Sequence, residues 1–487
     1  MKSIAVKISA TTIIYFILIV AFALRLYNLN YAGLWNDELY TANMANPGRS
    51  ISNVIFRLKL DIHPPLHNIL SNLWSRIFSY NDTSLRVFNV LIGVFGAFSI
   101  YKLAKLLFNS KVALYAMLLV VVNSFLIQYS QEVRAYALLF LLSNFSYFFY
   151  VKLTRGLLTR KNIIGYGLVT TALIYTHYFG LFVVASQVII LFLVVKWKDI
   201  KANLLRYGLA FVIPGLLFLF WAPTMYKHLT KTLGSWRVKP TPEILIEYFQ
   251  GFFNDYIISS IALILFFLTG LYFLLKLFIK LPKVKDFVGK RSKELLIIFL
   301  WALIYFLIPY LKSTFSSSMM GLKYFIAMTG PIIIMLAFYI DRIKGSQIRN
   351  GIVNGLIIYS VLVLFLKSNP YYHSATSYRE IAQEAKAINN DAPVLYLCKD
   401  GFYFDYYLHQ NNFMDRREDF VSFLTLVKKD SPKEYFVFLD LRLTPEKFKN
   451  GVPVIPGYEE VSSKTFRNAA NIKTVQLVHY KKTDQSI

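Results

Sequence analysis

Cysteine is almost absent from this sequence, with Cys398 the single example among 487 residues. One cysteine excludes an intramolecular disulfide and any metal site built on several thiolates. Charged residues are also scarce, at 16%, whereas soluble domains average about 25%. We therefore do not expect one soluble hydrophobic core.

Acidic residues are few as well, since 27 Asp and Glu face 53 Lys and Arg, for a net charge of +26. A basic balance is typical of nucleic-acid binding. Here the lysines and arginines lie between apolar blocks and form no basic domain, so we expect no nucleic-acid partner. The sequence also has no internal repeat, no low-complexity tract and, in residues 367–487, no nucleotide-binding glycine pattern.

Apolar residues are abundant instead. They make up 56% of the chain, aromatics make up 17%, and the mean hydropathy is +0.47. They occur in blocks of about 20 residues, the length that spans a bilayer. We predict a mainly α, polytopic bundle of about eleven transmembrane helices, the first retained because no cleavage site follows it. The predicted spans start near Ile8, Val87, Val112, Ala135, Ile163, Phe182, Tyr207, Tyr256, Leu295, Tyr324 and Ile352.

The distribution of basic residues predicts the orientation. If the N-terminus is cytoplasmic, every cytoplasmic connection is basic, including those near 152–161, 196–206 and 280–293. The opposite connections are nearly uncharged or serine-rich. This asymmetry favours an N-in, C-out topology in the cell membrane.

Three long segments are predicted outside, at about 28–86, 221–255 and 367–487. In the first, Ser50 is a candidate N-cap for an amphipathic, interfacial helix at 51–60. The last changes character, with a helix-like stretch at 377–389 and strand-like runs at 394–397, 435–439 and 475–478. We predict a transmembrane domain over 1–366 and a small extracytoplasmic α/β domain over 367–487.

Two adjacent acids, Asp37 and Glu38, follow Trp35 just after the first helix. Such a pair also fits a solvated loop. Charged groups beside a bilayer are costly unless they have a partner or a role. A partly buried carboxylate can act as a general base, so the pair is a candidate catalytic centre.

A second group is Asp61, His63 and His67, separated by Pro64-Pro65. The paired prolines predict that one helix stops at His63 and another starts after it, on a rigid corner. One carboxylate and two imidazoles suit a metal ion. They suit hydrogen bonds to a substrate or a plain structural turn equally well, and the residues leave these alternatives open.

Three further motifs carry polar residues at the same predicted face. Glu132, Arg134 and Tyr136 lie between the third and fourth spans, and the arginine fork suits a phosphate, although local charge balance explains it too. His177 and Tyr178 form a very short turn. Lys323 and Tyr324 begin the tenth span, where a lysine either neutralises a phosphate or snorkels. All five motifs fall on the predicted outer side.

Together these motifs resemble the GT-C membrane glycosyltransferases. The runs LWNDELYTA, DIHPPLHNIL, YSQEVRAYALL, YTHYFGLF and GLKYFIAMTGPIIIMLA, in that order between Ala21 and Leu336, are similar to glycosyltransferase family 39. That group includes protein O-mannosyltransferases and aminoarabinose transferases. Relatives often have Arg-Tyr where this chain has Lys323-Tyr324, so the charge is kept and the bidentate fork is lost.

The resemblance implies an inverting glycosyltransferase, in which Asp37 acts on the acceptor and Glu38 assists. It implies donor-phosphate contacts from Arg134, Lys323 and Tyr324. A divalent metal ion stays open, because some relatives hold one, with Glu38, Asp61, His63 and His177 as candidate ligands. The remaining residues expected to line the site are Trp35, Asp61, His63, His67, Glu132, Tyr136, His177 and Tyr178.

The implied partners are a polyprenyl- or dolichyl-phosphate-linked sugar, a hydroxyl acceptor (lipid, glycan or protein) and the bilayer. The transferred sugar is a hexosyl or pentosyl group, and the active site is extracytoplasmic. Two alternatives remain: a transporter or flippase of a lipid-linked saccharide, and a ligase or polymerase that uses a diphosphate-linked donor. Transporters tend to carry internal repeats and charges near the bilayer midplane, and this chain shows neither.

Overall fold

The structure, a computed structural model, describes residues 9–230, 239–278, 291–368, 378–388, 392, 394–397, 406–407, 427–440, 455–467 and 473–483. Cys398, the basic residues between 280 and 290 and the ends of the predicted 377–389 helix lie outside these ranges. Two compact units form. One comprises residues 1–27, 48–74 and 86–370, and the other comprises 28–47, 75–85 and 371–487.

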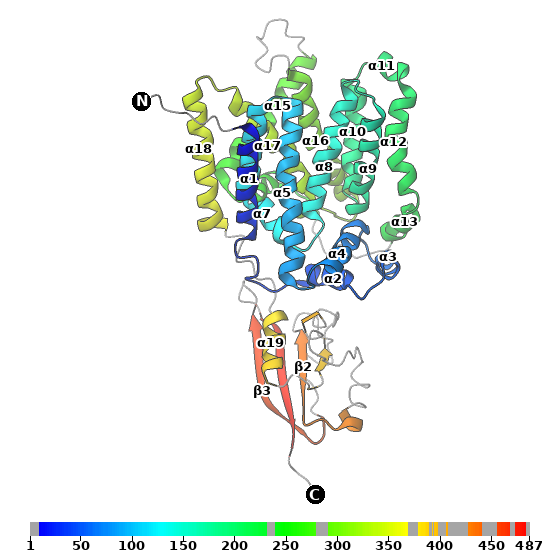
Figure 1. The fold of residues 1–487 in the computed structure, drawn as a ribbon, viewed down its shortest axis with the longest axis vertical. Helices are drawn as coiled ribbons and strands as arrows, with labels where there is room; N and C mark the ends of the chain where they lie inside the picture. Colours follow the sequence, from blue (N-terminus) through cyan, green and yellow to red (C-terminus); the bar gives the residue numbers. More distant parts are fainter. Residues whose placement is uncertain are drawn as a thin grey trace. The chain divides into compact units, whose positions relative to one another are not determined.

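The described chain is mainly helical, with strands confined to its last hundred residues (Figure 1). The first eleven helices are α1 (Ala10–Leu26), α2 (Asn36–Ala45), α3 (Ile51–Leu60), α4 (Leu66–Ile77), α5 (Asp82–Leu107), α6 (Ser110–Val122), α7 (Ser124–Gln131), α8 (Tyr136–Thr154), α9 (Arg160–Thr176), α10 (Gly180–Val194) and α11 (Trp197–Ala202). The later ones are α12 (Leu204–Phe218), α13 (Ala222–Thr230), α14 (Ile244–Phe253), α15 (Tyr256–Phe278), α16 (Ser292–Phe315), η2 (Leu322–Phe325), α17 (Ile326–Asp341), α18 (Ser346–Leu362), η3 (Val363–Ser368) and α19 (Tyr378–Ile388).

Each of the eleven predicted spans coincides with a helix. Six described helices are long and apolar enough to cross a membrane, or up to eight if each of two bent pairs is one span. The bent pairs are α6 with α7 and α12 with α13, while α1 and α10 are apolar but shorter. The mainly α, polytopic class is confirmed, and the number of eleven spans stays a prediction.

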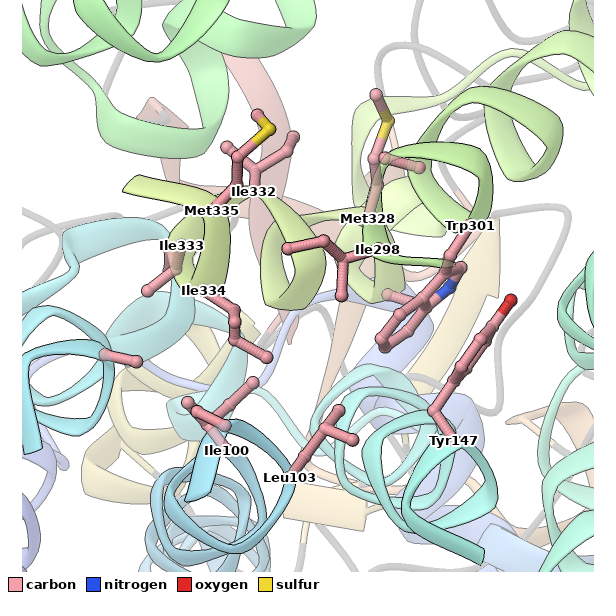
Figure 2. Close-up of a cluster of buried hydrophobic side chains, with 14 of the residues drawn as sticks. Ile100, Leu103, Tyr147, Ile298, Trp301, Met328, Ile332, Ile333, Ile334 and Met335 are labelled. Carbon is pink, nitrogen blue, oxygen red and sulfur yellow. The ribbon is translucent and has the colours of Figure 1, made fainter. Parts of the chain in front are cut away.

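The first unit is a helical bundle with α18 at its edge (Figure 1). Of the apolar stretch that includes α17, 83% is buried inside the protein. Of the apolar stretch that includes α18, only 17% is buried. Figure 2 shows the interior, where Tyr147 stacks on Trp301 with ring centroids 3.8 Å apart. Gly330 lets α17 approach α8, because a Cβ there would lie 2.7 Å from Asn144 Oδ1. Close packing of this kind replaces the hydrophobic driving force that a bilayer lacks.

A buried polar network joins α8, α9 and α10. The Tyr166 hydroxyl donates to Gln187 Oε1 at 2.7 Å, and Gln187 Nε2 donates to Ser146 Oγ at 2.9 Å. Ser146 in turn shares a 2.9 Å hydrogen bond with Thr170. Such groups have no water to bond in hydrocarbon, so the mutual bonds fix how these three helices align.

A buried arginine stabilises the 59° bend between α6 and α7. The Arg25 side chain, 1% exposed, donates to the carbonyls of Val120 and Val121 at the end of α6, at 3.1 and 3.2 Å. Its Nε also donates to Ser130 Oγ in α7 at 3.3 Å. A cation suits the free carbonyls at a helix C-terminus. Asn123 caps α7, so the bend is held on both sides, and α7 leads directly into the segment that carries Arg134.

The second unit contains a four-stranded sheet in the order β1-β2-β4-β3. Its strands are β1 (Val394–Leu397), β2 (Glu434–Asp440), β3 (Tyr458–Arg467) and β4 (Lys473–Lys482). β1 runs parallel to β2, and the other pairs are antiparallel. In β2, Tyr435, Val437 and Leu439 face one apolar cluster, while Phe436 and Phe438 are buried as well. Three strands and α19 match the predicted α/β tail; β3 was not predicted.

Candidate active site

The proline corner brings Asp61 and His63 together. α3 ends at Leu60, α4 begins at Leu66, and the intervening turn places His63 Nδ1 2.6 Å from Asp61 Oδ2. The other ring nitrogen, Nε2, lies 2.9 Å from Arg134 Nη2. A guanidinium can only donate, so His63 Nε2 accepts. The other nitrogen, Nδ1, then carries a proton, which it donates to Asp61.

Arg134 lies in the short link between α7 and α8. Its backbone N–H donates to the Glu132 carbonyl at 2.7 Å, which makes a tight turn before α8 begins at Tyr136. The side chain is 6% exposed. A guanidinium stays protonated at physiological pH and offers a planar fork of donors, which are the properties that a phosphate site requires.

His67 is separate from this hydrogen-bonded set. Its Nε2 lies 2.9 Å from Asn89 Oδ1, a buried residue of α5. Burial lowers the pKa of His67 to about 4, against the raising effect of the Asn89 hydrogen bond, and the positive charge of Arg134 lowers it further. The imidazole is thus neutral near pH 7. Among the described residues, no group of three or more His, Cys, Asp or Glu side chains gathers in a way that could hold a metal ion.

Lys323, Tyr324, Tyr136 and His177 form a second cluster in the bundle. Lys323 Nζ lies 5.4 Å from the Tyr136 ring centroid and 5.9 Å from that of Tyr324. The His177 ring packs 5.2 Å from Tyr324 and 6.3 Å from Tyr136. Cation–π contacts of this kind attract an ammonium group to the faces of aromatic rings.

Tyr178 belongs to a hydrogen-bonded chain with Trp221 and His228. Trp221 Nε1 donates to the Tyr178 hydroxyl at 3.1 Å, and that hydroxyl lies 2.8 Å from His228 Nδ1. His228 Nε2 lies 3.2 Å from the Lys59 carbonyl, so Nε2 carries the proton and Nδ1 accepts from tyrosine. Burial raises the pKa of Tyr178 to about 12, opposed by the Trp221 hydrogen bond and aided by the negative charge of Asp61.

His228 and Asn89 are polar members of this region that sequence reasoning missed. Neither stands in a recognisable motif. Asn89 lies inside an apolar helix, and His228 lies 50 residues from its partner Tyr178. The one available signal for His228 was a lone imidazole close after Trp221, in a long segment predicted to lie outside the membrane.

Asp37, Glu38 and Trp35 belong to the second compact unit. They start α2, where acids in the first turn are favoured by the helix dipole. Glu38 is 1% exposed, and its Oε2 accepts the Trp35 backbone N–H at 3.2 Å. Asp37 is half-buried. Glu38 therefore shapes the helix start, and Asp37 is the more accessible carboxylate.

Comparisons with known proteins bear on the family and the fold of this chain. Residues 62–232, about a third of the chain, match the family described as dolichyl-phosphate-mannose-protein mannosyltransferase. That range includes His63, Arg134, His177 and His228. No curated protein matches the sequence.

Among solved structures, the fold is similar to that of ArnT from Cupriavidus metallidurans in the apo state. The TM-score is 0.63 at 12% identity, covering 96% of this chain and 98% of that one. ArnT bound to undecaprenyl phosphate gives 0.58 at 13% identity, with the same coverage. The archaeal oligosaccharyltransferase AglB from Archaeoglobus fulgidus, in complex with an inhibitory peptide and a dolichol-phosphate, gives 0.51 at 10% identity over 98% of this chain and 75% of that one. At these identities the likeness establishes the fold.

Proposed function

We infer a specific sugar transfer for this chain, which by its matched segment and its fold is a GT-C glycosyltransferase similar to family 39. The enzyme moves a hexosyl or pentosyl group from a polyprenyl- or dolichyl-phosphate to a hydroxyl of a lipid, glycan or protein. It does so with inversion, on the extracytoplasmic face of the cell membrane. The observation that carries this proposal is the family match over 62–232, which includes the hydrogen-bonded pair of His63 and Arg134.

On the donor side, Arg134, Lys323 and Tyr324 bind the lipid phosphate. As the bond from the anomeric carbon to the phosphate oxygen breaks, negative charge grows on the leaving phosphate, and fixed cations stabilise it. Arg134 is held ready by His63, and Lys323 by two aromatic rings. The bound lipid phosphates of ArnT and AglB support a carrier of this class. The surrounding wall consists of Asp61, His63, His67, Glu132, Tyr136, His177 and Tyr178.

On the acceptor side, Asp37 takes the hydroxyl proton as the oxygen attacks the anomeric carbon. The new glycosidic bond forms as the bond between the anomeric carbon and the phosphate oxygen breaks. The lipid monophosphate is the leaving group. A hydroxyl is a weak nucleophile, so a positioned carboxylate base is needed. Glu38 holds the helix start beside Trp35. The described residues include no group of three or more His, Cys, Asp or Glu side chains that could hold a divalent metal ion.

The proposal is tested with the full chain in nanodiscs, supplied with labelled polyprenyl-monophosphate sugars and a membrane extract as acceptor source. We expect the label to leave the carrier and to add one sugar mass to a hydroxyl-bearing acceptor. Mass spectrometry of cell-envelope glycans with and without the gene identifies that acceptor. Transfer only from a diphosphate-linked donor would indicate a ligase. In sealed vesicles, movement of the intact lipid-linked sugar without bond cleavage would indicate a flippase.

A further inference from the structure

Two residues of the C-terminal part of the chain contact the segment that precedes Asp37. Arg379, on α19, donates through Nη1 to the Asn30 side chain at 2.9 Å and to the Asn30 carbonyl at 3.1 Å. Its Nη2 donates to the Tyr31 carbonyl at 2.9 Å. The planar guanidinium thus holds two successive residues, Asn30 and Tyr31, at once. A lysine ammonium lacks this fork of donors.

Tyr407 makes the second attachment. The Leu34 backbone N–H donates to the Tyr407 hydroxyl at 2.5 Å, and that hydroxyl donates to Asp82 Oδ2 at 2.8 Å. Arg379 Nη1 lies 3.7 Å from the same Asp82 oxygen. Leu34, Tyr407 and Asp82 are all buried, so the loss of the Tyr407 hydroxyl removes the hydrogen-bond partner of the buried Leu34 N–H.

Gly33 lies between these two attachments. A Cβ at this position would stand 2.8 Å from Arg379 Cβ and 3.1 Å from the Tyr407 hydroxyl. The backbone therefore passes the C-terminal residues at a distance that only glycine permits without displacement. Asn30 to Leu34 are held from both ends, and Trp35 and α2 follow at once.

We propose that Arg379 and Tyr407 are positioning residues for Asp37, and that this is a function of the C-terminal domain in the reaction. The proposal rests on the proposed role of Asp37 as the base. Leu34 is three residues before Asp37, so a shift of its anchored backbone displaces the carboxylate at the start of α2. Transfer rates are sensitive to displacements on the order of 1 Å in a reacting group.

The test compares Tyr407→Phe with Tyr458→Phe. Tyr458 is a matched control, because it is a buried tyrosine of the same unit whose hydroxyl donates to the Pro432 carbonyl at 2.6 Å and which lies in the sheet core. We expect Tyr407→Phe to lower kcat about tenfold, with donor KM within about twofold of wild type. Hydrogen exchange of residues 30–46 should become faster. Tyr458→Phe should leave kcat and this exchange unchanged, and Arg379→Lys should resemble Tyr407→Phe.

Equal losses of kcat in both tyrosine variants would show that the Tyr407 contact acts only by stabilising the domain. That result would overturn the proposal. Unchanged kcat and exchange in Tyr407→Phe would overturn it too. If the wild-type chain transfers no sugar, the proposed function fails instead. The exchange measurement then still decides whether these residues hold the Asp37 segment.

Discussion

Arg134 and His63 are joined by a 2.9 Å hydrogen bond in which the arginine is the donor and the imidazole Nε2 the acceptor. The direction follows from chemistry, because a guanidinium has no acceptor. It fixes the His63 proton on Nδ1, where Asp61 Oδ2 accepts it at 2.6 Å. This hydrogen bond joins two motifs that lie 71 residues apart in the sequence.

We expect Asp61→Asn to weaken the hydrogen bond between His63 and Arg134, although Asp61 acts on Arg134 only through His63. An asparagine amide can donate a hydrogen bond to His63 Nδ1. This favours the His63 tautomer whose proton is on Nε2. A protonated Nε2 cannot accept the hydrogen bond from Arg134. A lost buried hydrogen bond costs about 1–3 kcal/mol, so we expect donor KM to rise about tenfold or more. The measurement is the transfer rate against the concentration of lipid-phosphate sugar.

Asp341→Asn is a matched control for this change. Asp341 lies at the end of α17 and accepts from Asn109 Nδ2 at 2.9 Å. We expect its donor KM to remain at the wild-type value. If Asp61→Asn behaves like this control, the acid does not orient His63 for the donor site.

Replacement of Arg134 separates its charge from its geometry. Arg134→Ala should raise donor KM about a hundredfold, and Arg134→Lys by less, because lysine keeps the charge but loses the fork. Arg155→Ala serves as a control at the opposite end of α8, where Arg155 pairs with Glu294 at 2.8 Å. An unchanged donor KM in Arg134→Ala would remove this residue from the phosphate site.

Local signals were sufficient to predict many elements. Pro64 and Pro65 predict the corner between α3 and α4, Ser50 accepts from Asn53 N as the N-cap of α3, and each long apolar block contains a helix. These features depend on residues close in sequence. The resemblance to GT-C enzymes is confirmed by the family match and the fold.

Contacts between distant segments were not predictable in this way. No residue near His228 in the sequence indicates its hydrogen bond with Tyr178. Likewise, the apolar sequence of α5 does not indicate that Asn89 is the hydrogen-bond partner of His67. β3 is polar and exposed because it pairs with β4 alone at a sheet edge, so it lacks the apolar alternation that signals a strand. The burial of Glu38 likewise depends on packing around α2.

His67 should make stability depend on pH. Its pKa of about 4 in the folded chain lies below the value of 6.5 for a free imidazole, so the unfolded chain binds more protons in acid. Stability is then full above about pH 6.5 and falls as the pH drops toward 4, by about 2 kcal/mol at pH 5. Thermal unfolding in nanodiscs from pH 7.5 to 5 measures this loss.

His67→Gln is the companion variant, since glutamine keeps an N–H donor for Asn89 and does not titrate. We expect a smaller decrease in its unfolding midpoint over the same pH range. Parallel curves for wild type and variant would show that His67 is not the titrating group.

Tyr178→Phe should destabilise the bundle. It removes a hydroxyl that accepts from Trp221 and donates to His228, two buried residues. We expect a loss of about 1–3 kcal/mol, seen as a lower unfolding midpoint. Tyr175→Phe, which removes a single exposed hydrogen bond to the Leu217 carbonyl, is the control. Equal midpoints for the two variants would argue against the chain of bonds through Tyr178.

The role of Asp37 is the central claim, and one measurement tests it most directly. Initial rates of sugar transfer from a labelled polyprenyl monophosphate are compared for wild type, Asp37→Asn and Asp37→Glu at saturating donor. General-base catalysis contributes about 100-fold or more, so we expect Asp37→Asn to lose at least that factor in kcat, with donor KM retained and with partial activity in Asp37→Glu. Transfer by Asp37→Asn at near the wild-type rate would contradict the assignment of Asp37 as the base.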